Sequence, residues 1–101
     1  MEALARYENT TIQYYCLFLT AEHLALNKKH NEATLKYEQA LEEVGKLGHL
    51  HHLGLFNERY SDFLQRGRKS EKESRYRLEQ AIGYYKRWGA AHKVKTLESR
   101  L

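Results

Sequence analysis

The chain has 101 residues, of which 42% are hydrophobic and 30% charged, with a formal net charge of +4. This length provides one domain and leaves no room for a separate catalytic unit. No apolar run approaches the roughly 20 residues that span a bilayer, so we expect no membrane association. The single cysteine, Cys16, cannot form an internal disulfide, which favours a reducing, cytoplasmic location.

The composition predicts helices along the whole chain, because there is no proline and only six glycines. A first helix over about residues 7–28 has an apolar stripe that we expect to face the core: Ile12, Tyr15, Cys16, Leu19, His23 and Leu26. Leu17, Ala21 and Leu24 give the same helix a second apolar side, so it is expected to touch two neighbours.

Four further helices follow, and no stretch alternates like a strand. The second, about 31–47, is predicted to be capped by Asn31, and the third covers about 49–66. Ser70 and Glu73 form a capping box before the fourth helix, and a fifth covers about 90–100. The predicted core of these helices consists of Ala33, Tyr37, Ala40, Leu41, Val44 and Leu47, then Leu50, Leu53, Gly54, Asn57, Tyr60 and Leu64, then Ser74, Leu78, Ala81, Ile82, Tyr85 and Trp88, and finally Val94, Leu97 and Leu101.

An internal repeat relates these helices to one another. A shift of 41 residues places Glu38-Gln39-Ala40-Leu41 on Glu79-Gln80-Ala81-Ile82, and Leu47-Gly48 on Trp88-Gly89. Apolar residues coincide with apolar residues, and helix-ending glycines coincide with each other. We therefore predict that residues 1–101 form a single helical repeat domain of about two and a half helix pairs, each burying its face on the next.

The second helix carries the spacing Ala33-x3-Tyr37-x2-Ala40. This spacing resembles the second helix of a tetratricopeptide repeat, where small residues let two helices approach and the aromatic ring fills the gap between them. The period of 41 is longer than the usual one of about 34. The predicted fold class is therefore all-α, with about five helices in antiparallel helix-pair repeats, a tetratricopeptide-like α-solenoid fragment.

Two motifs stand out in the C-terminal half: Asn57-Glu58-x4-Phe63-x3-Gly67 and Tyr84-Tyr85-x-Arg87-Trp88-Gly89-Ala90-x2-Lys93-Val94-x2-Leu97-Glu98. They resemble a helical region near the end of the tetratricopeptide-like array in very large signalling proteins, and the resemblance covers about residues 12–99. Those proteins join a protein-kinase-like domain, an AAA-type ATPase, the helical array and often a sensory histidine kinase. The resemblance implies a regulatory scaffold, because the catalytic motifs of that family lie outside this segment.

Candidate catalytic and metal-binding residues are few. The chain has no G-x-x-x-x-G-K-[ST] loop and no H-R-D loop, so we predict that it is not an enzyme. Cys16 lies in mid-helix among apolar residues, where a thiol is usually inert. His49 and His52 have the spacing of two helical zinc or nickel ligands, but no further ligands complete a four-coordinate site. We predict surface histidines, no metal and no cofactor.

The C-terminal third is basic: residues 66–101 carry eleven Lys/Arg and four Glu, against six Lys/Arg and nine Asp/Glu before them. Aromatic residues interleave with these cations, which gives an alternative function as a basic helical module binding single-stranded nucleic acid. The predicted burial of Tyr85 and Trp88 disfavours it, because only Tyr76 and Tyr84 would then face outward. The basic-face candidates are Arg68, Lys69, Lys72, Arg75, Lys86 and Arg87.

Stacked helix pairs ordinarily contact other proteins through their exposed faces. We therefore predict a non-catalytic protein–protein interaction or scaffold module, a regulatory segment of a larger signalling ATPase or kinase. Its partners would be neighbouring repeats, another domain, a peptide or a second copy. The two apolar sides of the first helix predict a homodimer through that helix. The contact candidates fall off the predicted core stripes: Tyr14, Phe18, Leu35, Leu55 and Phe56.

Overall fold

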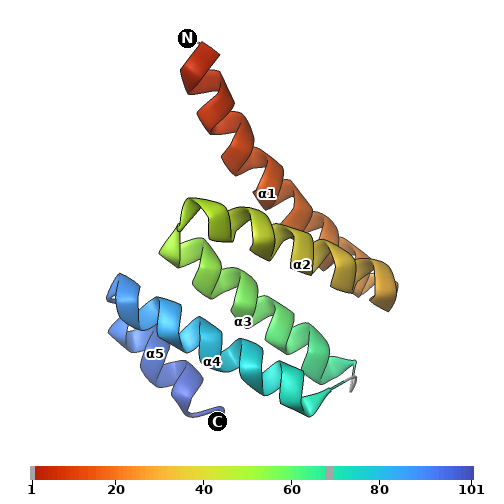
Figure 1. Ribbon diagram of the computed structural model, residues 1–101. Helices are drawn as coiled ribbons and strands as arrows, with labels where there is room; N and C mark the ends of the chain where they lie inside the picture. The colour runs from red at the N-terminus through yellow and green to blue at the C-terminus, as the bar shows by residue number, and fades with distance from the viewer. Residues whose placement is uncertain (1, 68–69) are drawn as a thin grey trace. The chain divides into compact units, whose positions relative to one another are not determined.

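The computed structural model describes the backbone of residues 2–67 and 70–101, with side chains from residue 11 onward in those ranges. These residues form five α-helices and no strand, as predicted: α1 (Glu2–Leu26), α2 (His30–Leu47), α3 (Leu50–Arg66), α4 (Glu71–Trp88) and α5 (Ala91–Glu98) (Figure 1). The chain separates into two compact units, Met1–Leu47 and Gly48–Leu101, which we call the N-terminal and C-terminal units. None of the described helices is both long enough and apolar enough to cross a membrane.

The N-terminal unit is a pair of helices, α1 and α2, joined by a short turn. Lys28 takes a left-handed φ of 60°, and the N–H of Lys29 donates to the carbonyl of Leu24 at 2.9 Å, which ends α1. The rings of Phe18 and Tyr37 meet edge to face at 6.3 Å, and the Tyr37 hydroxyl donates to Glu22. Both contacts pin the second half of α1 to α2, while the first turns of α1 project beyond α2 (Figure 1).

The predicted core face of α1 is wrong. Ile12, Leu19 and Leu26 are 56%, 52% and 76% exposed, and the core is formed instead by Tyr14, Phe18 and Ala21. Both sides of the helix are apolar, so periodicity alone does not choose between them. The side with two aromatic rings buries more area, because each ring covers about 150–250 Å². The predicted cap is also wrong, since α2 begins at His30.

The C-terminal unit packs α4 against α3 on one side and α5 on the other. The α3–α4 pair is antiparallel: Ser61 near the end of α3 bonds to Ser74 near the start of α4, and Gly54 near the start of α3 faces Tyr85 near the end of α4. A Cβ at Gly54 would lie 2.8 Å from the Tyr85 ring, so only glycine fits there. Five of the six predicted core residues of α4 are buried, together with Val94 and Leu97 of α5.

The ends of α4 follow the predicted signals. The Ser70 side chain accepts a hydrogen bond from the N–H of Glu73 at 3.1 Å, which caps the helix. At the other end Gly89 has a left-handed φ of 90°, and its N–H reaches the carbonyls of Tyr85 and Lys86. Gly48 also has a positive φ, 69°, so both aligned glycines take the conformation that favours this residue.

The 41-residue shift carries α2 onto α4 without an overhang, because His30 coincides with Glu71 and Leu47 with Trp88. Burial coincides as well: all four buried residues of α2 coincide with buried residues of α4, namely Ala33, Tyr37, Ala40 and Val44 with Ser74, Leu78, Ala81 and Tyr85. The predicted core extends too far at three helix ends, since Leu47, Trp88 and Leu101 are exposed. Leu47 and Trp88 are the last residues of their helices and Leu101 lies beyond α5, so the helical period alone overestimates their burial.

Candidate protein-contact surfaces

Three of the five predicted contact residues are buried. Tyr14 and Phe18 lie in the core of the N-terminal unit and Phe56 in that of the C-terminal unit, so these three predictions are wrong. The sequence predicts exposure for these residues because they fall off the apolar stripes that are expected to form the core. Leu35 on α2 is 56% exposed and Leu55 on α3 is half-buried, so these two side chains do reach the surface.

The largest change concerns α1, whose predicted core stripe faces solvent. We call this surface the α1 face. Its large aliphatic members Ile12, Leu19 and Leu26 are spaced by seven residues, and its other members include no Asp, Glu, Lys or Arg. A shallow groove of about 680 Å³ runs beside it, between α1 and α2. The exposed residues of the α1 face are Ile12, Gln13, Cys16, Leu19, Thr20, His23 and Leu26.

The predicted basic face is partly neutralised. Lys72, Arg75, Lys86 and Arg87 are exposed on α4, whereas Arg68 and Lys69 lie outside the described residues. Two of the four described cations have carboxylate partners, Arg75 with Glu79 at 3.4 Å and Lys86 with Glu98 at 3.5 Å. The Arg87 guanidinium lies 5.9 Å from the centre of the Tyr84 ring. Such exposed ion pairs contribute little to stability, but they lower the positive charge presented to a ligand.

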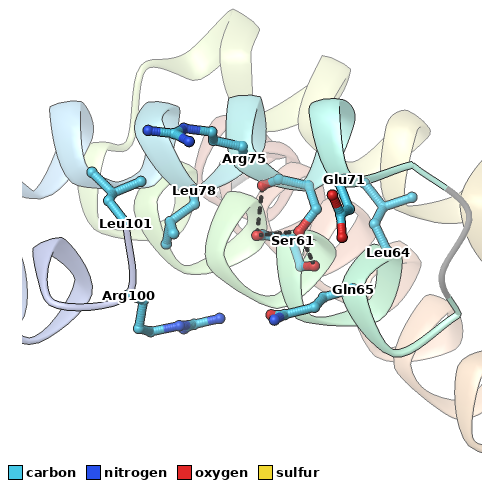
Figure 2. A pocket seen from close by; sticks show the side chains of 9 residues that line it. Ser61, Leu64, Gln65, Glu71, Arg75, Leu78, Arg100 and Leu101 are labelled. Atoms are coloured by element: carbon cyan, nitrogen blue, oxygen red, sulfur yellow. Dashed lines mark hydrogen bonds between the residues drawn. The ribbon is translucent and has the colours of Figure 1, made fainter.

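A groove of about 900 Å³ lies in the C-terminal unit between α3, α4 and the last residues of the chain (Figure 2). Arg100 and Gln65 extend toward each other along one rim, and Arg75 stands on the opposite one. The Ser61 hydroxyl, at the base, donates to the Ser74 carbonyl at 2.7 Å. Arg100 pairs with Asp62, as Arg75 does with Glu79, so the groove is polar but carries little net charge.

A buried polar network joins all three helices of the C-terminal unit. Glu58 on α3 accepts the Tyr85 hydroxyl at 3.0 Å and the Lys93 ammonium at 3.1 Å. Burial, followed by the Glu58 charge, raises the pKa of Tyr85 above its ordinary value of 10.0. The sequence analysis missed this role of Glu58. The available signal was its position four residues after Gly54 and three before Ser61, on one face of the helix.

The histidines at the start of α3 lie in a row of rings that ends at Trp88. The His51 and His52 rings are 4.0 Å apart, and the Trp88 ring lies 5.3 Å from His51. Burial, with His51 and His49 nearby, lowers the pKa of His52. Among the described residues, no three His, Cys, Asp or Glu side chains are grouped so that they could hold a metal ion. Trp88 is 55% exposed, so its predicted burial is wrong.

Neither a family model, nor a curated protein, nor a solved structure matches this chain. The resemblance to the helical array of large signalling proteins therefore stays a prediction from the sequence motifs.

Proposed function

We propose that this chain is a non-catalytic protein-interaction module and that its contact surface is the α1 face. The observation that supports the proposal is the row of three large aliphatic side chains, Ile12, Leu19 and Leu26, each more than half exposed. Exposed leucines occur singly on many proteins, but a row of them on one helix is typical of an interface.

The arrangement of these side chains favours another helix as the occupant. A spacing of seven residues places them on one line along α1, as in the seam of a coiled coil. On α1 the surrounding positions, such as Gln13 and Thr20, carry no charge, and the carboxylates Glu42 and Glu43 line the adjacent groove from α2. An uncharged apolar line is best covered by a surface of the same kind.

A second copy of the chain is the simplest occupant, in a symmetric dimer through α1. Leu19 lies midway between Ile12 and Leu26, so two antiparallel copies would place Leu19 on Leu19 and Ile12 on Leu26. Covering six half-exposed side chains contributes on the order of 6–9 kcal/mol. Association itself costs at least about 4 kcal/mol, so at most about 5 kcal/mol remains and we expect a weak dimer with a dissociation constant on the order of 200 μM.

The sequence resemblance extends this proposal to a biological setting. If the chain serves as a regulatory helical-repeat segment of a larger signalling ATPase or kinase, the same face would pack on neighbouring repeats or on another domain. The proposal assigns no reaction to the chain, because no nucleotide-binding loop or kinase catalytic loop occurs in the sequence.

Sedimentation equilibrium tests the proposal directly. We expect the average mass to rise from 12.0 kDa toward twice that value as the concentration passes about 200 μM. Leu19→Glu should keep the chain monomeric, because it places two carboxylates at the centre of the contact. Leu35→Glu is the matched control: it changes an equally exposed leucine on α2 and should leave association unaltered. A wild-type chain that stays monomeric at several times this concentration would refute the proposal.

A further inference from the structure

A second feature lies at one end of the C-terminal unit, where α3 begins, α4 ends and α5 begins (Figure 1). Trp88, the last residue of α4, is 55% exposed there, although it is the only tryptophan of the chain. An exposed indole is costly to hydrate and offers a broad flat surface. It belongs to the other unit of the chain than the α1 face, so it is a separate candidate site, independent of the function proposed above.

The Trp88 ring is the outer end of a row of rings that starts in the core. Phe56 is fully buried, His52 stacks on it at 5.7 Å with 6° between the planes, and His51 lies 4.0 Å from His52. Trp88 then contacts His51 at 5.3 Å. The indole is therefore supported on one side by neighbouring rings, so a ligand that stacks on it would order few side chains.

The charge around Trp88 is positive. Residues 80–97 contain no Asp or Glu but four Lys/Arg, and residues 48–57 contain no Asp or Glu either. Two carboxylates reach this end from outside these ranges: Glu58 pairs with Lys93, and Glu98 with Lys86. Arg87 and Lys95 then carry the remaining excess of positive charge, which favours a ligand with several negative groups.

Two helix N-termini lie at the same end and add to the positive electrostatic potential there. The N-cap residues of α3 and α5 are His49 and Ala90, and neither makes a side-chain capping hydrogen bond. The first N–H groups of a helix carry partial positive charge and favour phosphate oxygens. The exposed ring, Arg87 and two helix starts thus belong to the same end of the C-terminal unit, and Lys95 follows on α5.

We propose that this end of the C-terminal unit binds single-stranded nucleic acid, with one base stacked on Trp88 and the flanking phosphates held by Arg87, Lys95 and the helix starts. Base stacking on an aromatic ring requires an unpaired base, which excludes a duplex as the preferred ligand. An acidic protein segment would satisfy the cations but would supply no flat group for the indole. The exposed tryptophan therefore favours the nucleic acid.

The emission of Trp88 reports on this site without a label, because no other tryptophan contributes. We expect an oligothymidylate of about 12 nucleotides to quench it saturably, with an affinity that falls steeply between about 50 and about 200 mM salt. Anisotropy of a fluorescein-labelled copy of the same oligonucleotide then compares variants. Trp88→Leu should weaken binding roughly 5- to 150-fold, as expected for one lost stacked base.

Tyr76→Leu provides the matched control, since Tyr76 is 47% exposed near the other end of the same helix. It should leave affinity unchanged, and Lys95→Gln should reduce the salt dependence by about one phosphate contact. The proposal is overturned if no binding occurs at low salt, or if Trp88→Leu and Tyr76→Leu lose affinity equally. Equal, Trp88-dependent binding of polyglutamate would also overturn it, because the ligand would then be an acidic protein segment.

Discussion

The α1–α2 pair and the α3–α4 pair solve the same packing problem with different residues. Aligning α1 with α3 at a shift of 40 places the three buried residues described for α1 on buried residues of α3, and a shift of 41 does the same for the four buried residues of α2 on α4. Ser61 and Ser74, which bond to each other, then coincide with the fully buried alanines Ala21 and Ala33. Small residues occupy this position in both pairs, but only the C-terminal pair adds hydrogen bonds to the close approach.

At a further pair of aligned positions, the large side chain comes from the second helix in one unit and from the first helix in the other. In the C-terminal pair, Gly54 on the first helix leaves room for Tyr85 on the second. In the N-terminal pair, the corresponding residues are Tyr14 on the first helix and Val44 on the second, both fully buried. One large side chain is present in each pair: Tyr85 of the second helix in the C-terminal pair, and Tyr14 of the first helix in the N-terminal pair.

The polar groups are also distributed differently. All four buried polar or charged residues of the described part of the chain belong to α3 and α4: Asn57, Glu58, Ser61 and Ser74. The described residues of the N-terminal unit include no buried Asn, Glu or Ser, and its two helices are joined by the hydrogen bond from Tyr37 to Glu22. Directional hydrogen bonds fix the register of a helix pair, whereas apolar packing tolerates more shift. We therefore expect the register of the C-terminal pair to be fixed more strongly than that of the N-terminal pair.

The largest expected effect tests which aromatic residues of α4 support the fold. Tyr85→Ala should cost about 3–5 kcal/mol in the free energy of unfolding, because it removes a buried ring and leaves Glu58 without its hydroxyl donor. Trp88→Ala, three residues further on, should cost less than about 1 kcal/mol, because its ring is mostly exposed. Urea unfolding followed by circular dichroism measures both. Equal losses would show that the row of rings at Trp88 is part of the core.

An intermediate effect is expected at Gly54. The added methyl group of Gly54→Ala would lie within 3.0 Å of three Tyr85 ring atoms, and that ring is held by its bond to Glu58. Overpacking of this kind costs about 1–3 kcal/mol, although alanine is the better helix former. Gly83→Ala is the matched control, since nothing lies within 4 Å of its added Cβ, and it should stabilise α4. If Gly54→Ala were also stabilising, the close approach of Gly54 and Tyr85 described above would be wrong.

These contrasts also show what the sequence could predict. Helix number, the Ser70 cap, the glycine ends and the buried face of α4 follow from local signals and were predicted correctly. The inner face of α1 was not, because Ile12 and Tyr14 belong to two apolar stripes of similar strength and only the shape of α2 decides between them. The same misassignment explains why the exposure of the α1 face was not predicted. The sequence predicts a buried Trp88 because the helical period continues to the last residue of α4, whereas the side chain at that end is mostly exposed.

The smallest expected effect is a loss of stability at alkaline pH, and we expect Tyr85 of the C-terminal unit to contribute more to it than Tyr14 of the N-terminal unit. The pKa of Tyr85 is raised by burial and by Glu58, and the pKa of Tyr14 is raised mainly by burial. A tyrosine whose folded pKa lies above its unfolded pKa stabilises the fold fully below the unfolded value of 10.0. As the pH rises above that value, the unfolded chain loses the proton first, and stability falls by at most about 1.4 kcal/mol per pH unit for each group.

Urea unfolding at several pH values between about 9 and about 11, a range that spans the ordinary tyrosine pKa, measures how the free energy of unfolding changes with pH. Tyr85→Phe should flatten this dependence more than Tyr14→Phe, because Glu58 adds to the effect of burial on the pKa of Tyr85, whereas a hydrogen bond with Thr11 opposes the effect of burial on that of Tyr14. Both variants keep the ring, so the comparison isolates the ionisable group. If the wild type and Tyr85→Phe lose stability in parallel above the ordinary tyrosine pKa, the Glu58–Tyr85 contact does not hold the hydroxyl proton. The buried polar residues of the C-terminal unit would then have no effect on the ionisation of Tyr85.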